Sequence, residues 1–127
     1  MKKLIIYTDG ASKGNPGAMT VGIVFQVEKE IIRKITKKIG HGTNNQSEYN
    51  AVVIALDLAK KMGYSDVELR SDSQLLINQL NGEYAVKSNN IIPLYLKVKD
   101  LTTNFKSIIF KWVPRTENKL ADALSNE

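Results

Sequence analysis

The order of strand-like and helix-like segments restricts the fold of this chain more than any other feature. Residues 4–7 form an apolar run rich in β-branched residues, which is typical of a central strand buried on both faces. Helical spacing of apolar residues predicts a long helix over 46–62 that Ser47 caps and Gly63 ends. The remaining expected elements are strands at 20–28, 31–39, 67–72 and 107–113 and helices at 73–80, 91–101 and 117–124. This order predicts an α/β fold with a mixed sheet flanked by helices.

The size and charge of the chain narrow its class. Its 127 residues suit one domain, and no repeat or low-complexity stretch divides them, so we expect a single domain over 1–127. The absence of cysteine excludes a disulfide scaffold, a thiol nucleophile and a Cys-based zinc site, and it favours a cytoplasmic location. No apolar run is long enough to span a membrane. A formal net charge of +5 favours a polyanionic partner, above all nucleic acid.

Three acidic residues stand at the ends of expected elements, where a lone charge has no packing role. Asp9 follows the first apolar strand, Glu48 opens the apolar stripe of the long helix, and Asp72 ends the fourth expected strand. If the first and fourth strands are parallel neighbours, Asp9 and Asp72 emerge at one carboxyl edge of the sheet, where ligand crevices form. Helical spacing directs Glu48 toward the same sheet. The pattern therefore favours one acidic site over three coincidences.

Each acidic position also has an ordinary structural interpretation. Asp72 is suited to cap the helix that follows it. Glu48 would complement the helix dipole in the first turn, and Asp9 is suited to start a turn. Asp122 faces away from the apolar side of the last expected helix, so spacing alone predicts a solvated position there.

Four segments spread over almost the whole chain carry distinctive motifs: YTDGASKGNPG (7–17), TNNQSEYNAVVIAL (43–56), LRSDSQLLINQLNG (69–82) and WVPRTENKLADALSNE (112–127). In the same order they resemble the T-D-G-x-x-x-x-N-P-G, T-N-N-x-x-E, D-S-Q and E-N-x-x-x-D motifs of type 1 ribonuclease H. The resemblance implies a ribonuclease H-like mixed five-stranded sheet, with three antiparallel strands followed by parallel ones. It also implies that the catalytic, metal-binding carboxylates are Asp9, Glu48, Asp72 and Asp122. Asp122 owes its place in this set to the resemblance alone.

The reaction implied by the resemblance is endonucleolytic hydrolysis of the RNA strand of RNA–DNA hybrids. It would proceed without sequence preference and leave 5′-phosphate and 3′-hydroxyl ends. Two Mg²⁺ ions, which Mn²⁺ can replace, would activate water and stabilise the leaving oxygen. Because Mg²⁺ prefers oxygen ligands, four carboxylates without thiolate or histidine suit it better than Zn²⁺. By analogy with the family, Asp9 bridges both ions, Asp122 holds the water-side ion, and Glu48 with Asp72 holds the leaving-group side.

Choosing RNA over DNA requires contacts with the 2′-hydroxyl group. In the resembling family these contacts come from the loop after the first aspartate and from the T-N-N segment. The substrate-binding residues expected here are Gly10, Ser12, Asn15, Thr43, Asn44, Asn45, Gln46, Ser73, Gln74 and Arg115. Thr43 and Asn15 are the pair expected at a pocket for a DNA phosphate, and the alternative for residues 14–17 is an ordinary turn.

The sequence departs from the family in two places. Many members carry a histidine in the loop before the last carboxylate, but none lies between Trp112 and Asp122 here. The single histidine, His41, is expected to be an ordinary loop residue, and Arg115, in the region of the missing histidine, is expected to contact phosphate instead. Because arginine cannot shuttle protons at neutral pH, the role of the histidine would be replaced, taken by water, or absent. Residues 83–90 (EYAVKSNN) are too few and too weakly basic to form the extra helix and loop with which many members grip the hybrid.

Other basic residues would then supply the affinity for the hybrid, for example Lys87, Lys111 and Lys119. We interpret the lysine-rich stretch 33–38 as a solvated sheet edge, because edge lysines block pairing with another sheet. A monomer is expected, and the alternative within the same chemistry is a broader nuclease that also cuts double-stranded RNA or a DNA–RNA junction. The alternatives in other classes are a catalytically silent hybrid-binding module, which four retained carboxylates disfavour, and a resolvase or transposase core, which lacks the T-N-N and D-S-Q motifs.

Overall fold

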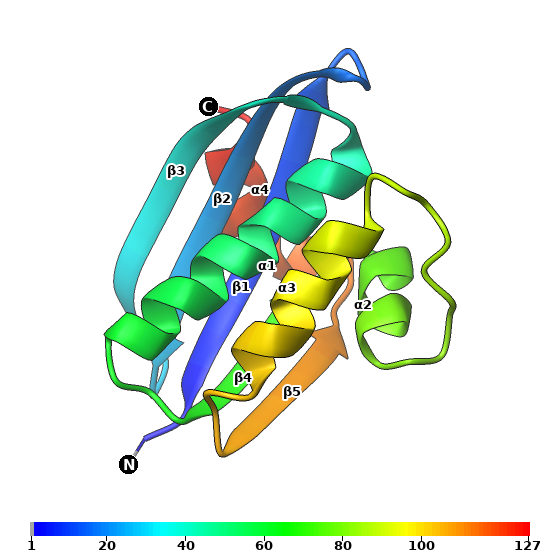
Figure 1. Cartoon of the computed structure of the whole chain (residues 1–127). Helices are drawn as coiled ribbons and strands as arrows, with labels where there is room; N and C mark the ends of the chain where they lie inside the picture. Colours follow the sequence, from blue (N-terminus) through cyan, green and yellow to red (C-terminus); the bar gives the residue numbers. More distant parts are fainter. Residues whose placement is uncertain (1) are drawn as a thin grey trace.

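A computed structural model describes residues 2–127, and a five-stranded sheet forms its centre (Figure 1). The spatial order is β3-β2-β1-β4-β5. β1 pairs antiparallel with β2, which pairs antiparallel with β3, whereas β4 runs parallel to both β1 and β5. This arrangement confirms the predicted fold class. The strands are β1 (Leu4–Lys13), β2 (Gly17–Val27), β3 (Glu30–Gly42), β4 (Asp66–Ser71) and β5 (Ser107–Trp112).

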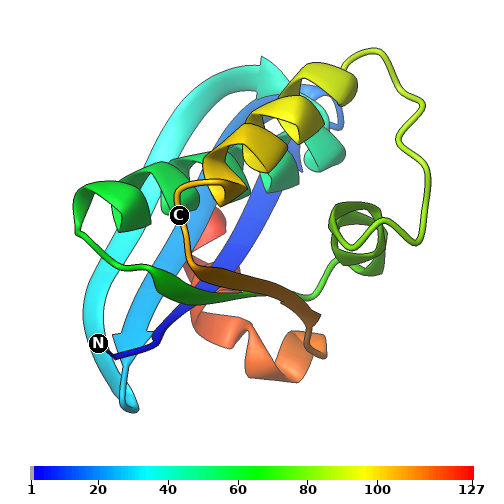
Figure 2. The same cartoon turned by 60° about the horizontal axis from the view of Figure 1, so that its bottom comes forward.

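Helices cover both faces of the sheet. One face carries α1 and α3, which lie side by side, and the opposite face carries α4 (Figures 1 and 2). Among the residues from 2 to 127, no helix is both long and apolar enough to cross a membrane. The helices are α1 (Asn44–Lys61), α2 (Gln74–Leu80), α3 (Ile92–Thr102), the 3₁₀ turn η1 (Arg115–Glu117) and α4 (Lys119–Ser125).

The core lies mainly between the sheet and α1. Alternate residues of the strands, such as Leu4 and Ile6 in β1 and Ile23 and Phe25 in β2, are fully buried, as are residues on one side of α1, such as Leu56. Burying a side chain of this size stabilises the folded chain by roughly 1.5–3 kcal/mol. The apolar periodicity that predicted these elements is therefore also what fixes α1 against the sheet.

The ends of two elements differ from the prediction. β1 continues to Lys13 instead of stopping at residue 7, because β2 pairs with it as far as the Lys13–Ala18 pair. α1 begins at Asn44, and Thr43 caps it instead of Ser47. The side chain of Ser47 is buried, and its hydroxyl donates to the carbonyl oxygen of Thr20 on β2 at 3.1 Å.

The hairpin between β2 and β3 closes with the two residues Glu28 and Lys29, both at positive φ (50° and 70°). This is the backbone of a type I′ turn, which glycine or asparagine would favour, so the sequence carried no strong hairpin signal. β3 is an edge strand, as the lysine-rich stretch predicted. His41 lies on β3 opposite Ala18 instead of in the expected loop, although it is exposed.

Candidate active site

Asp9 lies in β1 just beyond the end of the parallel pairing between β1 and β4. The last paired residues are Tyr7 and Arg70, so the sheet opens on that side at Asp9. The aspartate is only 7% exposed, and its Oδ2 accepts a hydrogen bond of 2.7 Å from the hydroxyl of Ser125 on α4. The crevice that opens between diverging strands is where ligands bind in α/β sheets. The alternative interpretation of Asp9 as a turn residue is wrong, because it lies inside the strand.

Glu48 reaches the same crevice from α1. Its Oε1 accepts a hydrogen bond of 2.7 Å from the backbone N–H of Gly10, the residue that follows Asp9. A Cβ atom on Gly10 would lie 2.4 Å from the carbonyl carbon of Ser47, so only glycine allows the helix to approach the strand this closely. Because α1 begins at Asn44, no acidic residue lies in its first turn, and Glu48 serves the sheet edge instead of the helix dipole.

Asp72 follows β4 directly and is partly buried. The next helix is capped by the side chain of Ser73, which accepts from the N–H of Leu76 at 3.2 Å, so the capping interpretation of Asp72 is wrong. The indole Nε1 of Trp112 donates to the backbone oxygen of Asp72 at 3.1 Å. Trp112 on β5 therefore holds the backbone of Asp72, and the carboxylate of Asp72 faces the crevice.

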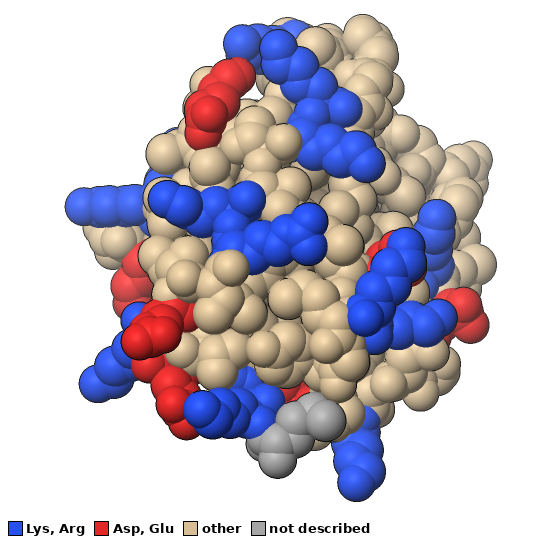
Figure 3. Space-filling view, turned by 90° about the vertical axis from the view of Figure 1, so that its left-hand side faces the viewer, with Lys and Arg blue, Asp and Glu red and all other residues tan. Residues whose placement is uncertain are grey.

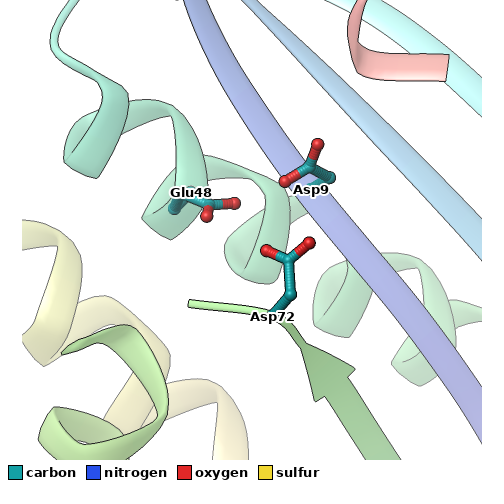
Figure 4. A group of neighbouring side chains, drawn as sticks. All are labelled: Asp9, Glu48 and Asp72. Carbon is teal, nitrogen blue, oxygen red and sulfur yellow. The ribbon is translucent and has the colours of Figure 1, made fainter. Parts of the chain in front are cut away.

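The three carboxylates converge on one point from three different elements (Figure 4). One oxygen from each of Asp9, Glu48 and Asp72 lies within 4.8 Å of the other two. Asp122 on α4 is not part of this close group, but it lines the same hollow, of about 220 Å³, together with Asp9, Asp72 and Arg115. Spacing alone predicted a solvated position for Asp122, yet its side chain is only 29% exposed because α4 packs beside β1.

The crowded carboxylates disturb one another's ionisation. Burial, followed by the charges of Asp72 and Asp122, raises the pKa of Asp9 to about 6, although the bond from Ser125 acts in the opposite direction. Burial, with the charges of Asp9 and Asp72, raises the pKa of Glu48 well above its ordinary value. Among the described residues, Arg115 is the single basic side chain that lines this hollow, and its Nη2 lies 3.5 Å from Oδ1 of Asp122.

These residues fit a divalent metal ion. The converging ligand atoms are all carboxylate oxygens, the donor type that hard cations such as Mg²⁺ or Mn²⁺ prefer over thiolate or imidazole. Their negative charges are buried together, and no described lysine or arginine neutralises the group of three. A bound cation would remove this repulsion, so the carboxylate cluster could hold a metal ion.

A groove of about 630 Å³ adjoins the cluster and gathers several of the residues expected to bind substrate. Asn15, Thr43, Asn44 and Asn45 line one side of it, and Lys87 from the loop before α3 is also in the lining. The turn after β1 is tied to the start of α1, since the N–H of Asn44 donates to Oδ1 of Asn15 at 3.0 Å. Because Asn44 lines both this groove and the acidic hollow, the groove continues from the hollow.

Of the other residues expected to bind substrate, some lie at the acidic hollow and others already form hydrogen bonds that cap helices. The N–H of Ser12 donates to Oδ1 of Asn44 at 2.8 Å, and Gly10 and Arg115 line the acidic hollow. Two side chains already serve helix starts: Ser73 caps α2, and Gln46 with Thr43 forms a capping box, in which Oε1 of Gln46 accepts from the N–H of Thr43 at 2.9 Å. Gln74 is exposed at the start of α2 and lines neither the hollow nor the groove.

Three residues that support the site were not predicted from the sequence. Ser125 orients Asp9, Trp112 holds the backbone of Asp72, and Asn118 is 1% exposed and donates from Nδ2 to the carbonyl oxygen of Thr8 at 2.9 Å. Asn118, which directly precedes α4, is therefore buried and does not face solvent. Ser125 follows Asp122 by three residues, so both face the same side of α4. That spacing was the one signal in the sequence that could have linked Ser125 to the site.

The mixed sheet, with an acidic cluster where β1 and β4 diverge, defines a ribonuclease H-like protein. A family model described as "Reverse transcriptase-like" matches residues 7–127. Ribonuclease HI of Halobacterium salinarum is 40% identical over 122 residues, and the crystal structure of RNase H1 from that archaeon superimposes with a TM-score of 0.95, covering 98% of this chain and 96% of that one. The chain therefore belongs to the type 1 ribonuclease H family.

Two other proteins extend the comparison. The chain is 35% identical over 127 residues to the bifunctional protein Rv2228c of Mycobacterium tuberculosis. The matched region covers 98% of this chain and 35% of that protein. The chain thus spans about a third of the Mycobacterium relative and 61% of the Halobacterium one. A crystal structure of LC11-RNase H1 in complex with an RNA/DNA hybrid is 34% identical, with a TM-score of 0.91 over 97% of this chain and 94% of that one.

Proposed function

We propose that this chain is an endonuclease that hydrolyses the RNA strand of RNA–DNA hybrids without sequence preference and leaves 5′-phosphate and 3′-hydroxyl ends. The observation that carries this proposal is the convergence of the Asp9, Glu48 and Asp72 carboxylates beside a groove partly lined by asparagine side chains. The relative LC11-RNase H1, crystallised with an RNA/DNA hybrid, supports the choice of substrate. We further propose that the chain acts as a single catalytic domain and a monomer in the cytoplasm.

Two Mg²⁺ ions, replaceable by Mn²⁺, would supply an activated water and stabilise the oxygen that leaves the scissile phosphate. Asp9 would help to hold both ions, since its carboxylate lies in the close group with Glu48 and Asp72 and also lines the hollow with Asp122. Glu48 and Asp72 would complete the site on the leaving-group side, and Asp122 would complete it on the water side. Four carboxylates shared between two dications leave the bound site close to neutral, which supports this assignment.

The supporting residues of the chain hold these carboxylates in fixed positions. The hydroxyl of Ser125 orients Asp9, and the N–H of Gly10 orients Glu48. Both donors belong to rigid elements, the helix α4 and the central strand β1, so the oxygens need little rearrangement before the reaction.

RNA selection would depend on groups beside the cluster that can contact a 2′-hydroxyl. Gly10 lines the hollow, and Asn44 lines both the hollow and the groove, so Asn44 would bridge the cleaved ribose and its neighbour. Asn15 and Thr43, which lie beside Asn44, would contact the DNA strand in the groove. Lys87 would supply a phosphate contact there in place of the longer basic element that residues 83–90 lack.

Arg115 stands in the region where many family members have a histidine. Its guanidinium lies 3.5 Å from Asp122 and is 78% exposed, so it is free to reach a phosphate of the substrate. It would attract the scissile strand and would not carry protons, because arginine remains charged at neutral pH. Water would then donate the proton that the leaving 3′-oxygen takes up.

The test is a cleavage assay with four 5′-labelled duplexes: an RNA–DNA hybrid, duplex RNA, duplex DNA and a DNA–RNA junction. Each is incubated with the protein in Mg²⁺, Mn²⁺ or EDTA. We expect cutting of the RNA strand of the hybrid at many positions with either metal, and no cutting in EDTA. Cleavage of the hybrid in EDTA would contradict the metal assignment, and preferential cleavage of duplex RNA would replace the hybrid as the substrate. Binding of the hybrid without cleavage in any metal would identify a silent binding module.

A further inference from the structure

A second groove, which shares no lining residue with the acidic hollow, lies between the edge strand β3 and the helices α1 and α3. It has a volume of about 520 Å³. Apolar side chains form its floor, among them Ile35 from β3, Val53 and Leu58 from α1, and Leu101 from α3. This floor continues the hydrophobic core outward, so the groove offers apolar surface where three elements meet at the protein's edge.

Basic side chains surround this apolar floor. Arg33 and Lys37 from β3, Lys61 from α1 and Lys97 from α3 line the groove. The one acidic residue in the lining, Asp57, is already paired with Lys61 at 3.0 Å. Within residues 2–127, Arg33, Lys37 and Lys97 form no ion pair with a carboxylate. Three unneutralised cations therefore stand around one apolar groove.

The alternation of β3 produces this arrangement. Arg33, Ile35 and Lys37 face α1, whereas Thr36 on the opposite face donates a hydrogen bond to the carbonyl oxygen of Leu124 on α4. Lysines lie on both faces of β3, but only the face toward α1 also contributes apolar surface to the groove. Seen from the β3 side, Lys and Arg side chains gather around a broad area of uncharged residues (Figure 3). Lysines alone would protect an edge strand from pairing with another sheet, so that protection does not account for the apolar groove beside them.

We propose that this groove binds an acidic segment of a partner protein that carries apolar side chains. Its carboxylates would pair with Arg33, Lys37 and Lys97, while its apolar side chains would cover the floor. The shape and lining favour this occupant over the alternatives. A nucleic acid would satisfy the cations but leave the apolar floor without a partner, and a membrane surface requires apolar side chains that protrude instead of lining a hollow.

Such a partner would bind without covering the active site. The α1 residues that line the groove, from Val53 to Lys61, follow Glu48 by 5 to 13 residues, which corresponds to roughly 8–20 Å along the helix. The groove shares no lining residue with the acidic hollow. The partner could therefore bring the protein to its substrate while the acidic hollow stays open. This inference does not depend on the proposed hydrolysis, because it concerns a different surface.

The experiment is selection of a random twelve-residue phage-displayed peptide library on the immobilised full chain, followed by fluorescence anisotropy with the selected peptides. We expect the enriched peptides to be acidic and to contain at least two large apolar residues. The double variant K37E/K97E should weaken their binding at least tenfold. The matched control K34E/K38E carries the same charge change on the other face of β3 and should weaken binding less than threefold. Thermal unfolding of both variants verifies that they are folded.

The remaining outcomes would overturn the proposal. These are failure to enrich any peptide, enrichment of peptides without acidic residues, and equal losses in the two double variants. A 20-nucleotide single strand and vesicles containing phosphatidylserine complete the assay. If either one loses binding in K37E/K97E while the peptides do not, the groove belongs to nucleic acid or lipid instead. Because peptide binding is measured without RNA or metal, failure here leaves the cleavage assay unaffected, and the reverse also holds.

Discussion

In the metal-free protein, replacing Asp9 by asparagine should stabilise the fold at pH 8. The residue is 7% exposed, and burial together with nearby carboxylates raises its pKa from 3.8 to about 6. A difference of about two pKa units between the folded and unfolded chain corresponds to roughly 3 kcal/mol once the group is ionised in both states. Asparagine keeps an acceptor oxygen for Ser125 and removes the charge. For a chain of this length the melting temperature of D9N should rise by on the order of 10 °C.

The stability difference between D9N and wild type should grow as the pH rises. Because the folded chain holds the Asp9 proton more tightly than the unfolded chain, the wild-type protein loses this stability as the pH rises from about 4 through 6. The variant lacks the Asp9 carboxyl and its titration, so its advantage should be small at pH 4 and full at pH 8. Circular dichroism melts in EDTA at both pH values measure it, with D100N on the exposed side of α3 as the control. Equal stabilities of D9N and wild type at pH 8, or an equal gap at both pH values, would refute the reasoning.

Three further predictions concern the same structure. G10A should lower the free energy of unfolding in urea by about 1–3 kcal/mol, because its Cβ would lie 2.4 Å from the backbone of Ser47; a loss below about 0.5 kcal/mol would contradict the close approach. Burial raises the pKa of Glu68, but the hydrogen bond and charge of Arg70 outweigh it, so the net pKa is lowered and the pair stabilises the fold only above that pKa. E68Q should therefore cost about 1–2 kcal/mol at pH 7, and this cost should shrink as the pH falls through the lowered pKa of Glu68, measured by thermal unfolding. Millimolar Mg²⁺ should raise the melting temperature of wild type by a few degrees and that of D9N much less, and equal shifts would place the ion elsewhere.

The sequence predicted the interior of each element better than its ends. Apolar spacing located the long helix, but its start depends on the Thr43 capping box, two hydrogen bonds that leave no periodic pattern. β1 continues through Asp9 and Gly10 because β2 supplies hydrogen-bond partners there, whatever the polarity of the side chains. The turn at Glu28 and Lys29 adopts positive φ without glycine or asparagine, so residue type alone gave little indication of it.

The site shows the same division between local pattern and tertiary contact. Asp9, Glu48 and Asp72 could be predicted to converge because parallel neighbouring strands present their carboxyl ends at one edge. Asp122 could not be found from spacing, since its helix crosses the opposite face of the sheet and its position there depends on how α4 packs on β1 and β2. The role of Ser125 follows from that same packing and was equally hidden in the sequence.

The most direct test of the central claim is the single-turnover rate at which the protein cuts the RNA strand of a labelled hybrid in Mg²⁺, measured for wild type and five variants. D9N, E48Q, D72N and D122N each remove one carboxylate from the close acidic group or from the hollow beside it, and D100N removes one from an exposed helix position. The account predicts a loss of at least about 10²-fold for D9N, E48Q and D72N, a substantial loss for D122N, and a rate within about twofold of wild type for D100N. Cleavage by D9N at the wild-type rate would show that the acidic cluster is not where the RNA is cut.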